Sequence, residues 1–193
     1  MQRRAFLHRL VALLPVSAGS SSLLAFGRQA LALGGTLPTL NAPAPDFDLP
    51  GIAPAADGQA LDTRLTLADF RGRWLVLYFY PRDFTGGCTL EARGFQKDLA
   101  AFQAANAAVV GVSADDADSH ADFCSSEGLA FPLLSDPAGT VSRAYGSWIA
   151  PFSQRHTFLI DPTGVLRASW VAVRPSGHSA EVLASLQELQ SSR

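Results

Sequence analysis

Cysteine is the residue type in this sequence best suited to covalent chemistry, and one of the two cysteines stands in a reactive setting. Cys88 follows Gly86 and Gly87 at the point where a predicted strand gives way to a predicted helix. The unpaired amides and positive dipole end of a helix N-terminus favour the thiolate, which is the nucleophilic form of the side chain. The glycines allow the backbone to approach whatever the sulfur attacks, and the hydroxyl of Thr85 can point into the same hollow. We therefore expect Cys88 to be reactive; an inert buried cysteine is the alternative.

The number and spacing of the cysteines argue against several other kinds of site. Two cysteines are too few for a disulfide-built miniature scaffold or a four-cysteine zinc site, although Cys88 and Cys124 could form one disulfide. A disulfide oxidoreductase uses a Cys-x-x-Cys pair, and here Thr85 and Glu91 stand three residues either side of Cys88. The three histidines within residues 33–193 show no metal-ligand spacing and are expected to serve packing or surface roles, so we expect no metal and no other cofactor. These histidines are His120, His156 and His178.

Composition and charge narrow the class of protein. With 193 residues, of which 48% are hydrophobic and 17% charged, the chain can bury one core and is not disordered as a whole. The formal net charge is −2, but residues 1–32 hold four arginines and no acidic residue. The rest of the chain keeps 11 of the 15 basic residues and all 17 acidic ones, a balance of −6. Nucleic-acid binding, which requires a basic surface, is not expected.

The N-terminal segment is typical of an export signal. Arg3 and Arg4 precede an apolar stretch and a small-x-small sequence at residues 30–32, which has the form of a cleavage site. The arginine pair resembles a twin-arginine signal; a generic basic n-region, a plastid transit peptide and a permanent anchor are the alternatives. Serines interrupt the apolar stretch, so stable membrane insertion is not expected. We predict a signal at residues 1–32, one domain at residues 33–193, and a periplasmic location, or the thylakoid lumen in a photosynthetic organism.

A strand and a helix must position Cys88. Residues 74–80 are apolar and aromatic throughout and end at Pro81, which is typical of a central strand buried on both faces. Apolar residues then recur at helical spacing to about residue 105, so a helix is expected to begin near Cys88. Residues 107–113 are again apolar and β-branched. The order strand, helix, strand predicts a parallel βαβ crossover and a sheet of α/β type.

The remaining elements are expected to surround this crossover. A segment rich in glycine and proline at residues 33–60 should wrap the core as turns and short strands. Asp115, Asp116 and Asp118 should cap the start of a helix that runs to about Glu127. Further elements are expected at residues 131–134 (strand), 139–145 (helix), 157–160 and 165–171 (hairpin), and 179–190 (helix, capped by Ser179).

The residues around Cys88 form a motif that resembles a known family. Pro81, Thr85 and Cys88, in the pattern P-x-x-x-T-x-x-C after the tripeptide YFY, are similar to the active-site signature of the peroxiredoxins. The peroxiredoxin Q group, also called bacterioferritin comigratory proteins, is the most similar. The resemblance extends over nearly all of residues 36–190. Further similar strings lie at residues 44–47, 67–72, 131–136 and 155–161.

This resemblance implies a thioredoxin-like fold, with a central mixed sheet flanked by helices, and thiol-dependent reduction of hydrogen peroxide and organic hydroperoxides. Cys88 would be the peroxidatic nucleophile, Thr85 would bind the peroxide oxygens, and Pro81 would shield the pocket. Arg155 would support the thiolate and the transition state. Donors of these kinds stabilise the charge that develops on a departing oxygen. Glu91, one helical turn after Cys88, is either a residue that orients an arginine or a solvated acidic residue.

The resemblance also implies a second thiol, because a sulfenic acid at Cys88 must condense with a thiol or risk irreversible overoxidation. Many family members carry this resolving cysteine five residues after the first, where this chain has Arg93. Some members place it in the following helix, and Cys124 is placed there. We therefore expect an intramolecular Cys88–Cys124 disulfide. One or both helices should unwind locally to form it, because disulfide geometry requires close α-carbons.

Other roles for the second cysteine stay open. Cys124 is alternatively a small core residue, and the enzyme then takes its second thiol from a partner or a small thiol. A secreted binding module with a permanent Cys88–Cys124 bridge is a hypothesis from a different class. For the peroxidase we expect a monomer that is recycled by a thioredoxin-like dithiol protein. Trp148, which lies in a predicted loop just before Arg155, is a candidate for shaping substrate entry.

Overall fold

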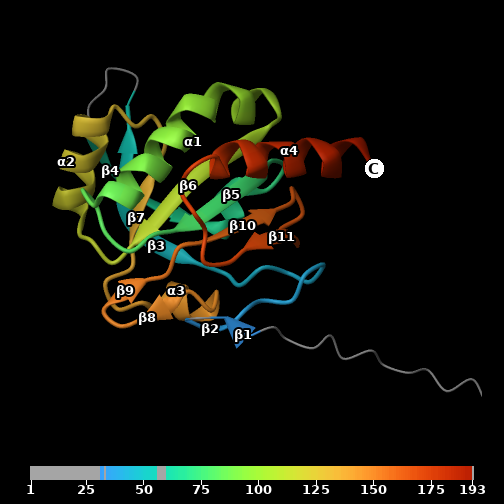
Figure 1. The fold of residues 1–193 in the computed structure, drawn as a ribbon, viewed down its shortest axis with the longest axis horizontal. Coiled ribbons are helices and arrows are strands. Elements are labelled where there is room, and N and C mark those ends of the chain that lie inside the picture. Colours follow the sequence, from blue (N-terminus) through green and yellow to red (C-terminus); the bar gives the residue numbers. More distant parts are fainter. Residues whose placement is uncertain (1–30, 33, 56–59, 193) are drawn as a thin grey trace, which may run out of the picture.

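The computed structural model describes residues 31–32, 34–55 and 60–192. The elements in chain order are β1 (Leu31–Ala32), β2 (Gly35–Thr36), β3 (Asp48–Pro54), β4 (Ala60–Thr66), the 3-10 helix η1 (Leu67–Phe70), β5 (Trp74–Phe79), α1 (Gly86–Ala104), β6 (Ala107–Ser113), α2 (Ala117–Glu127), β7 (Leu133–Ser135), α3 (Thr140–Ala144), β8 (Trp148–Ile149), β9 (Phe152–Ser153), β10 (His156–Ile160), β11 (Leu166–Trp170) and α4 (His178–Ser191). Seven strands form a mixed sheet in the order β11-β10-β5-β6-β7-β3-β4. Helices α1, α2 and α4 cover one face of this sheet (Figure 1).

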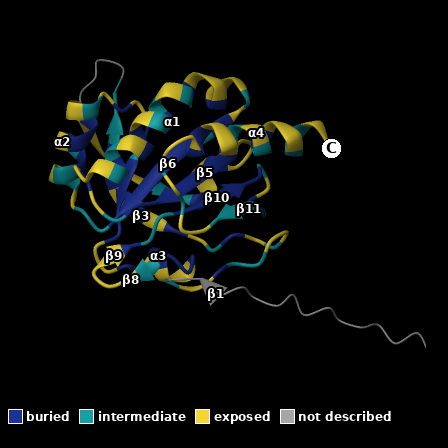
Figure 2. Cartoon of the chain, viewed as in Figure 1, coloured by how far each residue is buried: buried dark blue, intermediate teal, exposed yellow. Residues whose placement is uncertain are grey.

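The central strand β5 is buried along its whole length, as its sequence predicts. Its side chains alternate between two cores: Trp74, Val76 and Tyr78 pack under α1, α2 and α4. Leu75 and Leu77 pack on the opposite face with residues of η1 and α3. Strand β6 pairs with β5 in parallel, and α1 connects the two, so the predicted βαβ crossover is confirmed. Figure 2 shows the buried sheet in dark blue beneath helices whose outer surfaces are exposed.

The predicted helix starts are confirmed in one case and wrong in another. Asp116 caps α2, since its carboxylate accepts a hydrogen bond from the backbone N–H of Ser119 at 2.9 Å. Ser179 does not cap α4, because the N-cap is Gly177. The Ser179 hydroxyl instead donates to the Asp98 carboxylate of α1 at 2.6 Å, a tertiary contact that local sequence does not reveal. The predicted hairpin is confirmed as the antiparallel pair β10 and β11.

The segment at residues 33–60 does more than wrap the core. Its strand β3 is seven residues long and joins the main sheet between β7 and β4, which corrects the expectation of short strands and turns. Pro50 and Gly51 interrupt the apolar pattern of β3 and hide it in the sequence. Gly51 is required there, because a Cβ would overlap the backbone of Leu133 where β3 pairs with β7.

The predicted export signal falls almost entirely on residues 1–30, which lie outside the described residues. Strand β1, at the end of the predicted signal, pairs with β2 apart from the main sheet. In the part of the chain that the structure describes, no helix is long and apolar enough to cross a membrane.

Candidate active site

Cys88 occupies the first turn of α1. The helix begins at Gly86 after the N-cap Thr85, two residues earlier than the sequence predicts, so Cys88 is its third residue. The cysteine is buried, with 1% of its surface exposed. The first turn of a helix has backbone N–H groups without intrahelical partners, and Cys88 lies in that turn. The predicted placement of Cys88 at a strand-to-helix junction is therefore confirmed.

The pairing of β10 with β5 places Arg155 beside the sulfur of Cys88. Arg155 immediately precedes β10, and β10 pairs antiparallel with β5 so that His156 lies opposite Phe79, the last residue of β5. The guanidinium therefore reaches the end of β5 from which the chain enters α1. Its Nη2 donates to the sulfur of Cys88 at 3.3 Å, and its Nη1 donates to Glu91. Of the two interpretations of Glu91, the one in which it orients an arginine is confirmed.

Gly87 provides the space for this guanidinium. A Cβ at Gly87 would lie 3.1 Å from Nη2 of Arg155 and 3.7 Å from Pro175. A Cβ at Gly86 would have nothing within 4 Å. The two glycines therefore differ: a side chain at the second position would crowd the Arg155 guanidinium, and one at the first would not.

Burial and charge set the ionisation of the pair beside Cys88. Burial raises the pKa of Glu91 to about 7, because desolvation outweighs the charge and hydrogen bond of Arg155. Burial also opposes the charge of Arg155, but Glu91 and Cys88 outweigh it and raise the pKa of Arg155. The arginine therefore stays charged beside the sulfur. The Oε1 atom of Glu91 is buried and has no hydrogen-bond partner among the described residues.

Pro81 and Thr85 belong to the loop between β5 and α1. Pro81 is half-buried and lies two residues beyond the end of β5. Thr85 is exposed, and its hydroxyl donates to the carbonyl of Arg82 at 3.1 Å. Among the described residues predicted for the site, only Arg155 has a hydrogen bond to the sulfur of Cys88.

Cys124 lies on α2 and is a free, buried thiol like Cys88, with 5% of its surface exposed. Burial, with a further contribution from the charge of Asp83, raises the pKa of Cys124 to about 12. The thiol is therefore protonated at neutral pH. Arg93, at the position where many family members carry a resolving cysteine, instead pairs with Glu127 of α2 at 2.5 Å. This ion pair connects α1 with α2.

A buried polar cluster that the sequence analysis missed joins the β5–α1 loop to α2. Asp83 accepts hydrogen bonds from Tyr80 and Ser119, each at 2.8 Å, and its Oδ2 lies 2.9 Å from Nδ1 of His120. His120 is completely buried, and its Nε2 has no hydrogen-bond partner within the described ranges. From the sequence alone, His120 is expected to have only a packing or surface role. Asp83, the second residue after the YFYP segment, is the one signal that could have found the cluster.

Trp148 packs against α3 and its N-cap residue. It begins β8, and its ring lies against Gly139, where a Cβ would overlap it. The guanidinium of Arg143 lies 5.4 Å from the ring centroid, in cation–π geometry. These contacts give no support to the expectation that Trp148 shapes substrate entry. Within residues 31–32, 34–55 and 60–192, no group of three or more His, Cys, Asp or Glu side chains could hold a metal ion.

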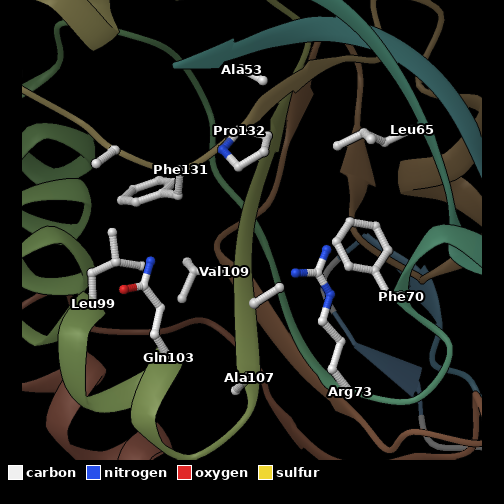
Figure 3. A pocket seen from close by; sticks show the side chains of 12 residues that line it. Ala53, Leu65, Phe70, Arg73, Leu99, Gln103, Ala107, Val109, Phe131 and Pro132 are labelled. Atoms are coloured by element: carbon white, nitrogen blue, oxygen red, sulfur yellow. The ribbon is translucent and has the colours of Figure 1, made fainter. Parts of the chain in front are cut away.

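A cavity of about 280 Å³ lies far from this site (Figure 3). Its wall includes Ala107, which pairs with Trp74 at the start of β5, whereas Pro81 follows the end of β5. The cavity is therefore at the opposite end of the sheet from Cys88. Its polar side chains, Arg73 and Gln103, lie on opposite sides of β6 (Figure 3).

Comparison with known proteins assigns the chain to a family. The AhpC/TSA family model matches residues 40–169. Peroxiredoxin Bcp of Xanthomonas campestris pv. campestris is 40% identical over 157 residues, which are 77% of this chain and 94% of the relative. Peroxiredoxin Bcp of Bacillus subtilis is 34% identical over 154 residues, which are 76% of this chain and 93% of the relative.

Solved structures agree with this assignment. Xanthomonas campestris peroxiredoxin Q matches with a TM-score of 0.66 and 37% identity, over 74% of this chain and 90% of that one. A variant of Xylella fastidiosa PrxQ matches with a TM-score of 0.67 and 34% identity, over 83% and 98% of the two chains. The expected thioredoxin-like fold with a mixed sheet flanked by helices is therefore confirmed. The chain belongs to the AhpC/TSA family, in its peroxiredoxin Q (Bcp) group.

Proposed function

We propose that this protein is a thiol-dependent peroxidase in which Cys88 reduces hydrogen peroxide and organic hydroperoxides. The thiolate attacks one peroxide oxygen, the O–O bond breaks, and the departing oxygen takes a proton to leave as water or an alcohol. The main observation in support of this proposal is that Nη2 of Arg155 lies 3.3 Å from the sulfur of Cys88, in the first turn of α1. Xanthomonas campestris bacterioferritin comigratory protein, whose solved structure is 35% identical to this chain, has alkyl peroxide reduction activity, which supports this substrate class.

The surrounding residues have separate roles in this proposal. Arg155 favours the thiolate and stabilises the charge on the departing oxygen. Glu91 fixes the guanidinium through its second arm. Thr85, the N-cap residue of α1, binds the peroxide oxygens with its hydroxyl. Pro81 shields the sulfur from water.

Cys124 is proposed as the resolving cysteine. Two solved variants of Xanthomonas campestris peroxiredoxin Q each replace one cysteine by serine, and the two replaced positions are 36 residues apart. Cys88 and Cys124 have the same separation, which supports an intramolecular disulfide between them. Because Cys124 is buried on a separate helix, parts of α1 and α2 must unwind before the sulfurs can bond.

A thioredoxin-like dithiol protein is proposed to reduce this disulfide, and the enzyme is proposed to act as a monomer. The test is peroxide-dependent oxidation of a thioredoxin by the purified protein. Cys88→Ser should abolish it. Cys124→Ser should keep a single turnover of peroxide but lose turnover with thioredoxin. Full turnover by Cys124→Ser would show that Cys124 is not the resolving cysteine. Activity of Cys88→Ser would overturn the proposed function. The oligomeric state is tested separately, by analytical sedimentation of the reduced and disulfide forms.

Export is also proposed, with residues 1–32 as a twin-arginine-like signal for delivery to the periplasm or thylakoid lumen. The support is the sequence itself: an arginine pair, an apolar stretch and a small-x-small cleavage sequence. Replacing Arg3 and Arg4 together by lysine should stop export through a twin-arginine route while keeping the charge. Unchanged export of the double variant would show that the pair is only a general basic region.

A further inference from the structure

The buried pair formed by Asp83 and His120 has an arrangement that suits proton transfer. Nδ1 of His120 lies 2.9 Å from Oδ2 of Asp83, so the carboxylate fixes a proton on Nδ1. The other ring nitrogen, Nε2, then carries a free lone pair in the neutral imidazole. It is completely buried and has no hydrogen-bond partner in the part of the chain that the structure describes. A carboxylate that orients a histidine whose second nitrogen is free is the arrangement that activates nucleophiles in many enzymes.

Two observations place Cys124 on the same side of α2 as this pair, without a hydrogen bond between His120 and Cys124 in the dithiol form. His120 and Cys124 are four residues apart on α2, so their side chains share one face of the helix. The charge of Asp83 also contributes to raising the pKa of Cys124, so carboxylate and thiol lie within electrostatic reach of one another. With its pKa at about 12, Cys124 must lose a proton before it can attack.

We propose that His120, oriented by Asp83, is the base that takes the proton of Cys124 when the resolving disulfide forms. This inference rests on the proposed role of Cys124. The thiol proton moves to Nε2 of His120, and the sulfur of Cys124 attacks the sulfur of the Cys88 sulfenic acid. The S–S bond forms as the S–O bond breaks, and the leaving hydroxide takes a proton back from the imidazolium and departs as water. Cys124 is oxidised, Cys88 is reduced, and no further oxidant is needed.

Asp83 is also held through its backbone. Asp83 belongs to the loop that enters α1, and its backbone N–H donates to Asp115 at 2.9 Å. The imidazole contacts Asp83 of this loop and Tyr80, which directly follows β5. Cys124 lies one turn further along α2, and Asp115 lies behind Asp83.

The experiment separates peroxide attack from disulfide formation. The full-length reduced protein is mixed with one equivalent of hydrogen peroxide, quenched by thiol alkylation and resolved by mass spectrometry into thiol, sulfenic acid and disulfide. His120→Asn is the main variant, because the Asn amide can still donate to Asp83 but has no nitrogen in the place of Nε2. Sulfenic acid should form at the wild-type rate, and the disulfide should form on the order of 100-fold more slowly.

The pH profile distinguishes a base from a purely structural residue. In His120→Asn the disulfide rate should rise about tenfold per pH unit from pH 6 to 9, since only the spontaneously formed thiolate then reacts. The wild-type rate should rise less steeply. Asp83→Asn, which no longer orients the imidazole, should be slow as well, and it keeps the test decisive if His120→Asn fails to fold. Ser119→Ala removes a different hydrogen bond to the same carboxylate and should leave the disulfide rate within about twofold of wild type.

Each other outcome has a defined meaning. A disulfide rate equal to or above wild type in His120→Asn would overturn the proposal, and a higher rate would show that the histidine only clamps α2. An equal slowing in Ser119→Ala would also overturn it, since the effect would then come from general loosening. If the wild-type protein forms no Cys88–Cys124 disulfide, the proposed role of Cys124 fails first, and this inference fails with it.

Discussion

At the scale of single residues, the guanidinium of Arg155 is the group that connects the residues of this site. It is forked, so one arm contacts the sulfur of Cys88 while the other contacts Glu91. A lysine has one charged nitrogen and cannot keep both contacts in the same geometry. In the sequence, only the family resemblance points to Arg155, because 67 residues separate it from Cys88 and no local pattern links them.

Arg155→Lys is expected to slow the reaction of Cys88 with hydrogen peroxide by about 10²- to 10³-fold, the usual cost of removing one oriented donor from a developing charge. The second-order rate constant is measured by stopped flow or by competition with a reference peroxidase. Urea unfolding of the same variant serves as the control and should show a small change only. A wild-type rate constant in a folded variant would contradict the role of Arg155.

Glu91 should make stability depend on pH. Its pKa is about 7 in the folded protein, above the value of about 4.3 expected in an unfolded chain. Between these values the folded state holds a proton that the unfolded state has lost, so stability falls as pH rises from about 4.5 to 7, by on the order of 3 kcal/mol. Glu91→Gln should remove this slope. Urea unfolding of both proteins across this pH range checks the prediction, and parallel curves would refute it.

At the scale of elements, two neighbouring glycines at the start of α1 offer a matched pair of substitutions. Gly87→Ala places a methyl group 3.1 Å from Nη2 of Arg155, so it should displace the guanidinium and slow peroxide reduction at least tenfold. Gly86→Ala meets nothing within 4 Å and should keep wild-type activity. Alanine also suits a helix better than glycine by about 0.5–1 kcal/mol, so Gly86→Ala should not lose stability. Equal activity of the two variants would show that Gly87 is not needed for the approach of Arg155.

At the scale of the whole molecule, catalysis requires that one end of a well-packed fold can open. Cys88 and Cys124 belong to the core beneath α1, α2 and α4, and an ion pair between Arg93 and Glu127 also links two of these helices. The other end of α1 packs against α4 and the sheet. Opening should therefore stay local to the first turns of α1 and to α2, while β5 and β6 remain folded.

Amide hydrogen exchange of trapped redox states measures this opening. In the disulfide form, residues 88–93 and 120–127 should lose protection relative to the reduced form. Residues 74–79 and 107–113, in the central strands, should keep theirs. Equal protection of the two helical segments in both forms would contradict local unwinding, and loss of protection in the central strands would indicate global rather than local opening.

The sequence by itself determined the elements whose signal is local. The apolar run of β5, the helical spacing of α1, the glycine pair and the position of Cys88 at the junction all follow from neighbouring residues, and each was predicted. The sequence did not reveal β3 as a long strand, because Pro50 and Gly51 break its pattern, nor Gly177 as the cap of α4.

Only the tertiary structure decided which distant groups meet. The antiparallel register of β10 on β5 brings Arg155 to Cys88, and the packing of α2 on the β5–α1 loop brings His120 to Asp83. Hydrogen bonds and burial of this kind depend on strand order and helix packing, which join residues far apart in the chain. A histidine that the sequence assigns to packing or surface therefore becomes, in the folded protein, a buried and oriented imidazole.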